Sequence, residues 1–340
     1  MSTKFRITGL SAARTAPAIE DRYETIVVGG GPAGLTAALY SVRYGHKTLL
    51  VTKLLGGNIT EAPLVDDYIG VPDVSGNDLA DKFVKHVKKY NVPIVIDEVV
   101  DVVRKPEENL WCVRLRDLKK EVCAYSIILA VGSEKKKLGV PGEKELVGKG
   151  VSYCATCDGP LFKGKTVAVV GGGNAALTSA IYLAKIASKV YLIHRRSEFR
   201  AFNVYVEAAR SNPNIKFLLD SVIKEIIGRD RVEAIRVLNL ATGEESVVNV
   251  DGVFVEIGLQ PPVEFFKKIG LELDETGRVM VKVDRSTNLP GIFVAGDAAG
   301  GPFKYRFEQI ITAAADGAIA ADAACKYVCA LKHAGGSAPR

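Results

Sequence analysis

The chain has 340 residues, of which 48% are hydrophobic and 25% charged, and its formal net charge is +6. This length exceeds one hydrophobic core, and the composition is that of an ordinary globular protein. No run of about 18 apolar residues occurs, so we expect no membrane span. The basic residues are scattered except for Lys135, Lys136 and Lys137, which we expect in a solvated loop. No nucleic-acid motif accompanies them, so we expect no nucleic-acid partner.

The first 20 residues lack the apolar run and cleavage site of a secretory signal, and we expect an N-terminal extension of a cytoplasmic protein. Six cysteines in such a chain do not form a secreted disulfide framework. The scarcity of thermolabile side chains favours a thermophilic prokaryotic source. The only glutamines and methionines are Gln260, Gln309, Met1 and Met280.

The first predicted element pair is a strand that leads through a glycine turn into a helix. Residues 25–28 are a β-branched run, residues 29–34 read GGGPAG, and Leu35, Leu39 and Val42 follow at helical spacing. Such glycines permit a sharp turn, let backbone N–H groups approach a pyrophosphate, and let helix and strand pack closely. The phosphate charge then faces the positive end of the helix.

The next predicted strands, residues 111–116 and 120–125, form a hairpin in which Cys112 and Cys123 could face one another. Cysteines in such positions are mostly small, buried apolar groups. A structural disulfide is the alternative, and it is conceivable in an intracellular protein if the source is a hyperthermophile.

Cys154 and Cys157 form a CxxC motif within the sequence CATCDG. Cysteines at this spacing can close a small disulfide ring, and such motifs commonly provide a reactive thiolate near neutral pH. The adjoining Asp158 could relay a proton when a disulfide is split. Zinc needs four ligands, and the chain has no second CxxC and no histidine pair at metal-binding spacing. We therefore predict a redox dithiol and no metal.

A second strand, glycine turn and helix follow the dithiol, with residues 166–170 leading into GGGNAA at residues 171–176. Thr52 lies 52 − 29 = 23 residues after the first glycine of its copy, and His194 lies 194 − 171 = 23 after its counterpart. The two units are in register. We therefore predict an α/β fold with two Rossmann-like dinucleotide-binding domains.

The residues after the second unit favour NADPH over NADH. Arg195, Arg196 and Arg200 stand where an NAD site would place an acid for the ribose. Guanidinium groups offer fixed bidentate donors that suit a 2′-phosphate. The first unit has Thr52 and Lys53 at the corresponding positions, so this turn alone does not identify its dinucleotide.

Near the C-terminus, residues 292–299 predict a strand that ends in Gly296-Asp297, ahead of a helix from Glu308 to about Lys332. An aspartate there is well placed to accept hydrogen bonds from a polyol such as the ribityl chain of FAD. The alternative is a capping aspartate. We expect Cys325 and Cys329, four residues apart on the helix, to serve in helix packing.

In this order the motifs resemble those of the low-molecular-weight thioredoxin reductases, over roughly residues 22–330. The most specific part is CATCDG between two glycine fingerprints, followed by HRRxxFRA from His194. The resemblance implies an FAD domain formed by residues 1–133 and 263–340, with residues 1–20 as an extension. An NADPH domain, residues 134–262, is inserted and carries the dithiol. Hinges near residues 133–149 and 258–264 would let it rotate between the flavin and the protein substrate.

The same resemblance implies roles for individual residues. Cys157 would lie nearest the flavin, Cys154 would attack the substrate disulfide, and Asp158 would protonate the leaving thiolate. The partner would be a thioredoxin-like protein and the assembly a homodimer. The implied FAD contacts are Gly29, Gly31, Pro32, Ala33, Gly34, Thr52, Gly57, Asn58, Asp67, Gly132, Gly296, Asp297, Gln309 and Ile310. The implied NADPH contacts are Gly171, Gly173, Asn174, Ala175, His194, Arg195, Arg196, Arg200 and Gly258.

The chain departs from the family pattern at three places near the expected flavin. Asn58 replaces a glutamine, residues 67–70 (DYIG) replace Asn-aromatic-Pro-Gly, and Glu308 replaces an arginine. An added carboxylate disfavours negative charge on a reduced cofactor, so we expect an altered flavin environment or donor preference.

Three alternatives remain beside NADPH-dependent reduction of thioredoxin. The same dithiol flavoenzyme could take electrons from NADH or ferredoxin, or could serve a glutaredoxin-like protein. A ferredoxin–NADP reductase shares the architecture but lacks the dithiol. A nucleotide-binding sensor of oxidation would change state once, whereas an enzyme turns over.

Overall fold

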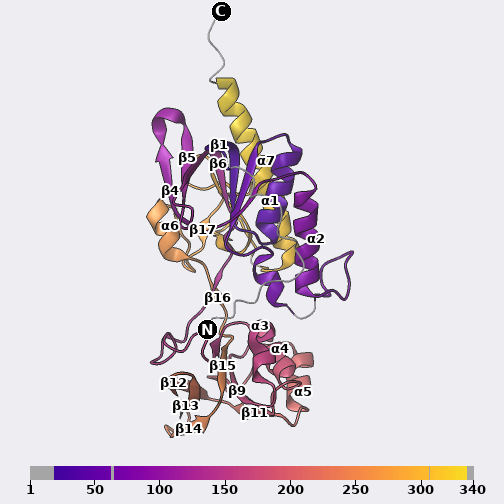
Figure 1. Cartoon of the computed structure of the whole chain (residues 1–340), viewed down its shortest axis with the longest axis vertical. Helices are drawn as coiled ribbons and strands as arrows, with labels where there is room; N and C mark the ends of the chain where they lie inside the picture. Colours follow the sequence, from indigo (N-terminus) through magenta and orange to yellow (C-terminus); the bar gives the residue numbers. More distant parts are fainter. Residues whose placement is uncertain (1–18, 63–64, 306, 335–340) are drawn as a thin grey trace, which may run out of the picture.

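The computed structural model describes residues 19–62, 65–305 and 307–334. The chain forms two lobes stacked along its long axis (Figure 1). The larger lobe contains the first third of the chain, in indigo and purple, and the yellow helix α7. The smaller lobe contains the middle of the chain, and a narrow connection that includes β16 joins the lobes.

The larger lobe is built on a seven-stranded sheet of order β3-β2-β1-β6-β5-β4, with β18 beside β6. β3, β2, β1, β6 and β18 run parallel, whereas β4, β5 and the first part of β6 form an antiparallel meander. The strands are β1 (Arg22–Val28), β2 (Thr48–Thr52), β3 (Ile94–Ile96), β4 (Val99–Lys105), β5 (Leu110–Leu115), β6 (Glu121–Leu129) and β18 (Ile292–Val294).

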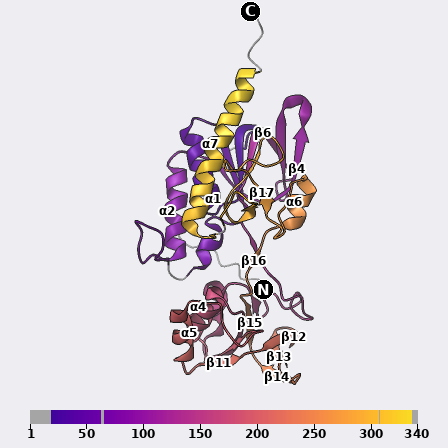
Figure 2. The ribbon, with the colours of Figure 1, turned by 180° about the vertical axis from the view of Figure 1, so that it is seen from behind.

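Side chains alternate between the two faces of this sheet, and both faces are buried. Val27 and Ile128 pack on one face with apolar residues of α1 (Pro32–Arg43), α2 (Gly76–Lys88) and α7 (Ile310–Ala334). These helices lie on the same side of the sheet (Figure 2). Ile26 and Ile127 face the other way, toward α6 (Val263–Ile269) and β17 (Val279–Met280), where Phe266 is fully buried. Near-continuous apolar strands are typical of a parallel sheet covered on both faces.

The smaller lobe is built on a five-stranded parallel sheet of order β11-β10-β9-β15-β8. One face packs on α4 (Asn174–Leu183) and α5 (Asn203–Arg210), and the other on a three-stranded antiparallel sheet, β12-β13-β14. The strands are β8 (Val151–Ser152), β9 (Thr166–Val170), β10 (Lys189–Ile193), β11 (Ile215–Leu218), β12 (Ser221–Gly228), β13 (Val232–Asn239), β14 (Glu245–Asn249) and β15 (Gly252–Val255).

All strands of the smaller lobe lie between β6 and β18 in the chain, so this lobe is an insertion into the larger one. Where the chain passes between the lobes, β7 (Glu134–Lys135) pairs antiparallel with β16 (Leu259–Gln260). The predicted α/β fold with two Rossmann-like regions is confirmed. The remaining elements are α3 (Ala155–Asp158), β19 (Ala299–Gly300), η1 (Gly57–Glu61), η2 (Pro106–Glu108), η3 (Gly159–Phe162) and η4 (Gly296–Ala298).

Cys112 and Cys123 are opposite one another on β5 and β6, and the structure joins them by a disulfide. Both are buried. The sequence left two interpretations open, buried free thiols and a structural disulfide, and the structure contains the disulfide. Within the described residues, Cys112, Cys123 and Glu121 are the one group whose atoms lie close enough to hold a metal ion, and the disulfide occupies both sulfurs.

We expect the Cys112→Ala/Cys123→Ala double variant to lose about 2 to 4 kcal/mol of the free energy of unfolding, because the cross-link constrains the unfolded chain. Guanidinium unfolding measures the loss, with Cys329→Ala, an exposed free thiol of the same lobe, as control. Alkylation of the denatured, unreduced protein should label the two free cysteines, Cys325 and Cys329. Labelling of Cys112 or Cys123 would contradict the cross-link.

Candidate active site between the lobes

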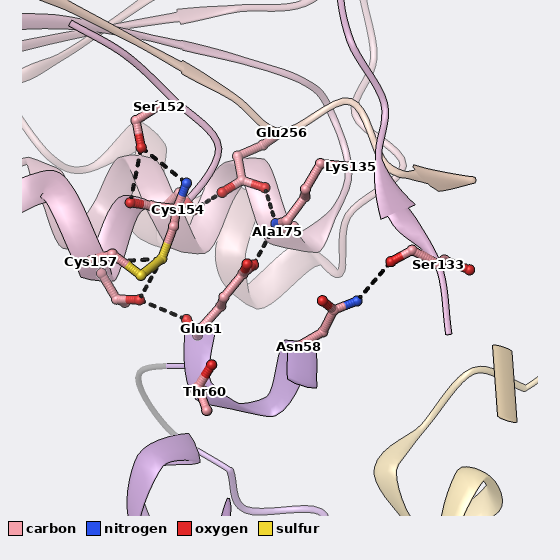
Figure 3. Close-up of polar contacts among 12 residues, drawn as sticks. Asn58, Thr60, Glu61, Ser133, Lys135, Ser152, Cys154, Cys157, Ala175 and Glu256 are labelled. Carbon is pink, nitrogen blue, oxygen red and sulfur yellow. Dashed lines mark hydrogen bonds and ion pairs between the residues drawn. A yellow bond between two sulfur atoms is a disulfide. The ribbon is translucent and has the colours of Figure 1, made fainter. Parts of the chain in front are cut away.

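The dithiol lies at the start of a short helix in the smaller lobe, on the side that faces the larger lobe (Figure 3). Cys154 and Cys157 are joined by a disulfide, and the Cys157 N–H donates to Cys154 Sγ at 3.2 Å. Ser152 Oγ accepts from the Cys154 N–H at 3.0 Å and donates to Asp158 Oδ2 at 2.7 Å. One serine therefore ties the Asp158 carboxylate to the backbone of the disulfide loop.

The disulfide loop also contacts the larger lobe. Thr156 Oγ1 donates to the backbone oxygen of Glu61, the last residue of η1, at 2.9 Å. Cys154 is half-buried and Cys157 is exposed in the protein. The two sulfurs are therefore within reach of a group that binds between the lobes.

The first glycine turn leaves the N-terminus of α1 free for an anion. Gly31 is the N-cap residue, no side chain caps the helix, and no acidic residue lies in its first turn. A Cβ atom on Gly31 would meet nothing closer than 4.0 Å, so the turn is open on that side. Gly29 has φ +115°, and a Cβ there would lie 2.1 Å from the Ala130 carbonyl oxygen. Pro32 begins the helix without removing a needed donor.

The second glycine turn repeats this arrangement at the N-terminus of α4. Gly173 is the N-cap residue without a side-chain cap, no acidic residue follows, and a Cβ at Gly173 would meet nothing within 4 Å. Gly171 has φ +153°, and a Cβ there would lie 2.2 Å from the Glu256 carbonyl oxygen. Both turns thus fit a dinucleotide pyrophosphate, which needs open N–H groups at a helix start.

A shallow basic pocket of about 390 Å³ follows β10 in the smaller lobe, and its lining includes Arg195, Arg196 and Arg200. The three arginines are exposed, and no ion pair is recorded for them with the described residues. His194 is buried beneath them and stacks on Phe199 with ring centroids 5.2 Å apart. Burial and the neighbouring arginines lower the pKa of His194, so its ring is neutral near pH 7. The ring packs against the turn at Gly172, where a Cβ atom added to the glycine would clash with it.

The turn at Gly296 and Asp297 follows β18 and lies among buried ion pairs that the sequence did not predict. Asp316 of α7 is 4% exposed and pairs with Arg285 at 2.9 Å and with Lys304 at 2.7 Å. Its Oδ2 also accepts from the Gly296 N–H at 3.2 Å. These contacts fix the turn that presents Asp297.

Asp297 itself is half-buried, and burial raises the pKa of its carboxyl group, with a further contribution from Glu308. No hydrogen bond of this carboxyl group with another described residue is recorded. Arg278 donates from Nε to the Asp297 backbone oxygen at 3.1 Å and forms an ion pair with Glu308. Asp297 is thus free to accept from a bound polyol, and Arg278 offsets the charge of Glu308.

The other predicted FAD contacts lie mostly at the same edge of the larger sheet. Thr52 ends β2, Gly57 and Asn58 begin η1, and Asn58 Nδ2 donates to the Ser133 backbone oxygen at 3.2 Å. Asp67 differs, because its side chain is exposed in the loop closed by the Val65–Val74 bridge and has no recorded contact with another predicted site residue. The remaining ones are Ala33 and Gly34 in α1, Gly132 after β6, and Gln309 and Ile310 at the start of α7.

The remaining predicted NADPH contacts surround the second turn. Asn174 Oδ1 accepts from the Phe202 N–H at 2.8 Å, which ties the turn to the start of α5, and Ala175 follows it in α4. Gly258 lies beyond β15 with φ +103°, and a Cβ there would meet nothing within 4 Å. Sequence reasoning did not find Ser152, whose only signal is its position two residues before Cys154.

A comparison with known proteins agrees with this geometry. Residues 23–317 match the family model described as pyridine nucleotide-disulphide oxidoreductase. The chain belongs to this family of flavoenzymes, in which FAD and NADPH are the usual cofactors.

Within the family, thioredoxin reductases are among the proteins that this chain resembles over most of its length. The chain is 38% identical to the thioredoxin reductase of Bacillus subtilis, over 91% of this chain and 96% of that one. The structure of Lactococcus lactis thioredoxin reductase in the FR conformation is 34% identical over 91% and 99% of the chains, with a TM-score of 0.83. A ferredoxin-flavin thioredoxin reductase from Clostridium acetobutylicum is also 34% identical, over 92% and 100%, with a TM-score of 0.50.

Proposed function

We propose that the chain is a thioredoxin-disulfide reductase that uses NADPH, FAD and the Cys154–Cys157 pair to reduce a thioredoxin-like protein. The observation that carries the proposal is a disulfide on a loop of the smaller lobe that is hydrogen-bonded to the larger lobe, in a chain where each lobe has an open glycine turn. A sensor of oxidation would not need two dinucleotide sites.

We propose that residues 1–133 and 263–340 bind FAD and that residues 134–262 bind NADPH. The basic pocket supports the second assignment, because three guanidinium groups suit the 2′-phosphate that distinguishes NADPH. The unengaged Asp297 supports the first, because a ribityl chain offers hydroxyl donors. Within each site we assign the contacts to the residues predicted from the sequence, with Asp67 as the weakest member because it is exposed in its loop.

The dithiol then cycles between two states. Bound FAD and NADPH would supply the electron pair for this site. The Cys154–Cys157 disulfide accepts two electrons and one proton, so the S–S bond breaks and leaves a thiolate on Cys154 and a thiol on Cys157. The Cys154 thiolate attacks the substrate disulfide, forming a mixed disulfide and releasing one substrate thiolate, to which Asp158 relays a proton taken up from solvent. Cys157 then attacks Cys154, releasing the second substrate thiol and restoring the Cys154–Cys157 disulfide. Ser152 holds Asp158 in place for the proton transfer.

Sequence identity does not select the electron donor, because the Lactococcus enzyme and the ferredoxin-flavin enzyme are both 34% identical to this chain. The exposed arginines favour NADPH over ferredoxin and NADH. The negative charge of Glu308 by itself would change the environment of a flavin. Arg278 forms an ion pair with Glu308 and offsets this charge, so we propose that the change is small.

We further propose that two copies of the chain form a homodimer. The larger lobe has an apolar groove of about 350 Å³ between α1, α2 and α7, and Tyr40 and Ile311 on its wall are 41% and 37% exposed. A second copy would cover this surface. Light scattering of the purified protein measures the mass, and a monomer at micromolar concentration would contradict the proposal.

Within the described residues, no helix is long and apolar enough to cross a bilayer. We propose a cytoplasmic location, where NADPH and thioredoxin-like proteins meet.

A thermophilic source remains a proposal from composition, supported by the small number of glutamine and methionine residues. Thermal unfolding of the purified protein tests it, since a midpoint below about 65 °C is typical of mesophilic domains.

Steady-state turnover with alternative donors and acceptors tests the proposed function. We expect saturable oxidation of NADPH with a thioredoxin-like protein disulfide, and slower turnover with NADH, reduced ferredoxin or a glutaredoxin-like protein. Faster turnover with ferredoxin than with NADPH would reject the donor assignment. If none of the acceptors supports more than one turnover, the hypothesis of an enzyme is rejected and that of an oxidation sensor is supported.

A further inference from the structure

The two sulfur atoms of the Cys154–Cys157 disulfide have unequal hydrogen-bond contacts. Cys154 Sγ accepts from the Cys157 backbone N–H at 3.2 Å, and Thr156 Oγ1 lies 3.5 Å from the same sulfur. For Cys157 Sγ, no hydrogen bond with a residue that the structure describes is recorded. Hydrogen bonds to a charged group favour its charged form. The loop therefore favours a thiolate on Cys154 over a thiolate on Cys157.

The Thr156 hydroxyl lies between this sulfur and the larger lobe. Thr156 Oγ1 donates to the backbone oxygen of Glu61 at 2.9 Å, and Glu61 lies close to Cys154 and Cys157 (Figure 3). The side chain is half-buried, and its branched Cβ restricts the rotation that would move the oxygen. A hydroxyl has one proton to donate, and a disulfide sulfur is a weak acceptor. The carbonyl of Glu61 therefore holds this proton while the disulfide is intact.

Reduction of the disulfide changes this competition. Two electrons and one proton break the S–S bond and leave a thiolate on Cys154 and a thiol on Cys157. Hydrogen bonds to an ionised acceptor are about twice as strong as neutral ones. Rotation about the Cβ–Oγ1 bond of Thr156 turns its proton from the Glu61 carbonyl to Cys154 Sγ, while the oxygen stays in place. The thiolate then accepts from the Cys157 N–H and from the Thr156 hydroxyl.

The charged groups around the loop do not stabilise this thiolate. The short helix α3 packs on η1, η3 and α4. The titratable side chains of these elements and of the loop are Glu61, Tyr153, Asp158 and Tyr182, none of which is cationic. A negative charge on Asp158 or Glu61 disfavours the thiolate, and Lys135 is already paired with Glu61. The Cys154 thiolate therefore depends on the uncharged donors of its own loop.

We infer that Thr156 is a further catalytic residue, whose hydroxyl donates to the Cys154 thiolate and stabilises it for attack on the protein disulfide. The inference rests on the proposed function, because that function assigns the attack to Cys154. The sequence gives residue 156 no role beyond its place in CATCDG, and the contact with the sulfur is what assigns one.

Replacing Thr156 by valine tests the inference, because valine keeps the branched shape and lacks the hydroxyl. The FAD-containing protein is reduced with a small-molecule dithiol, which is then removed without air. Mass spectrometry follows alkylation of Cys154 by iodoacetamide as a function of pH. We expect the midpoint of this profile to rise by about 0.5 to 1 pH unit in Thr156→Val. Below the midpoint the variant should react about two to four times more slowly than wild type. Above it the variant should react at least as fast, because a more basic thiolate is the better nucleophile.

Two further variants make the test specific. Thr156→Ser keeps the hydroxyl and should restore the wild-type midpoint to within about 0.2 pH unit. Thr178→Val removes a hydroxyl that donates to the Asn174 backbone oxygen within α4, and it should leave the profile unchanged. A Thr156→Val midpoint equal to that of wild type would overturn the inference. So would a change by one factor at every pH, since loss of the Glu61 contact would then have altered access to Cys154 instead of its thiolate.

The readout separates this inference from the proposed function. Alkylation of chemically reduced Cys154 requires neither NADPH nor a protein substrate. An unchanged Thr156→Val profile would reject the role of the hydroxyl and leave turnover with thioredoxin-like proteins unaffected as a claim. A chain without NADPH turnover would still show the difference between Thr156→Val and Thr156→Ser.

Discussion

Replacing Cys154 by serine is expected to lower turnover of protein disulfides to below about one thousandth of the wild-type rate, because Cys157 alone cannot re-form the disulfide that completes the cycle and the two free cysteines lie outside the site. Cys325 is buried, with a pKa raised to about 12 by burial, and Cys329 lies at the far end of the larger lobe on α7. The measurement is NADPH oxidation with a thioredoxin-like protein as acceptor.

The same variant should keep its flavin reducible by NADPH, since both glycine turns remain intact. Cys329→Ala is the matched control, and its turnover should equal that of wild type because the exposed Cys329 lies outside the interlobe site. If Cys154→Ser turns over at more than about a tenth of the wild-type rate, another thiol must attack the substrate disulfide, and the role assigned to Cys154 is contradicted.

The second large effect is expected at the basic pocket. The Arg195→Gln/Arg196→Gln/Arg200→Gln variant should lose at least about 100-fold in kcat/KM for NADPH, because charge-assisted hydrogen bonds to phosphate contribute about 1.5 to 3 kcal/mol each. The kcat/KM for NADH should change by less than about threefold, since NADH lacks the 2′-phosphate.

Arg210→Gln is the control for this variant. Arg210 is an exposed arginine in the last turn of α5, in the same lobe, and it does not line the pocket. It should leave both nucleotides unaffected. Equal losses for NADPH and NADH in the triple variant would indicate damage to the glycine turn, and no loss for either would place the 2′-phosphate elsewhere.

Local sequence patterns predicted the parts of the molecule that depend on neighbouring residues. The glycine turns could be predicted because strand, turn and helix are consecutive, and the equal 23-residue offsets aligned Thr52 with His194. The hairpin of β5 and β6 was also predicted, because its alternation and its turn are local. Whether Cys112 and Cys123 are bonded depends on their register across the strands, which the structure supplied.

Contacts between distant segments could not be predicted in the same way. Lys135 lies in a run of three lysines that the sequence predicts to be a solvated loop, yet its side chain is only 22% exposed. It lies between Glu61, 74 residues before it (135 − 61), and Glu256, 121 residues after it (256 − 135). Asp316 similarly meets Arg285 and Lys304 only because α7 packs beside the Gly296 turn. Charges of this kind look like surface residues until the fold brings their partners together.

The central claim is that electrons pass from NADPH through the flavin to the Cys154–Cys157 pair, and an anaerobic titration of the purified holoprotein with NADPH tests it most directly. The account predicts bleaching of the flavin absorbance with uptake of one electron pair for the flavin and one for the disulfide. The Cys154→Ser variant should take up only the first. A flavin that stays oxidised with NADPH but bleaches with dithionite would contradict the account and require another electron donor.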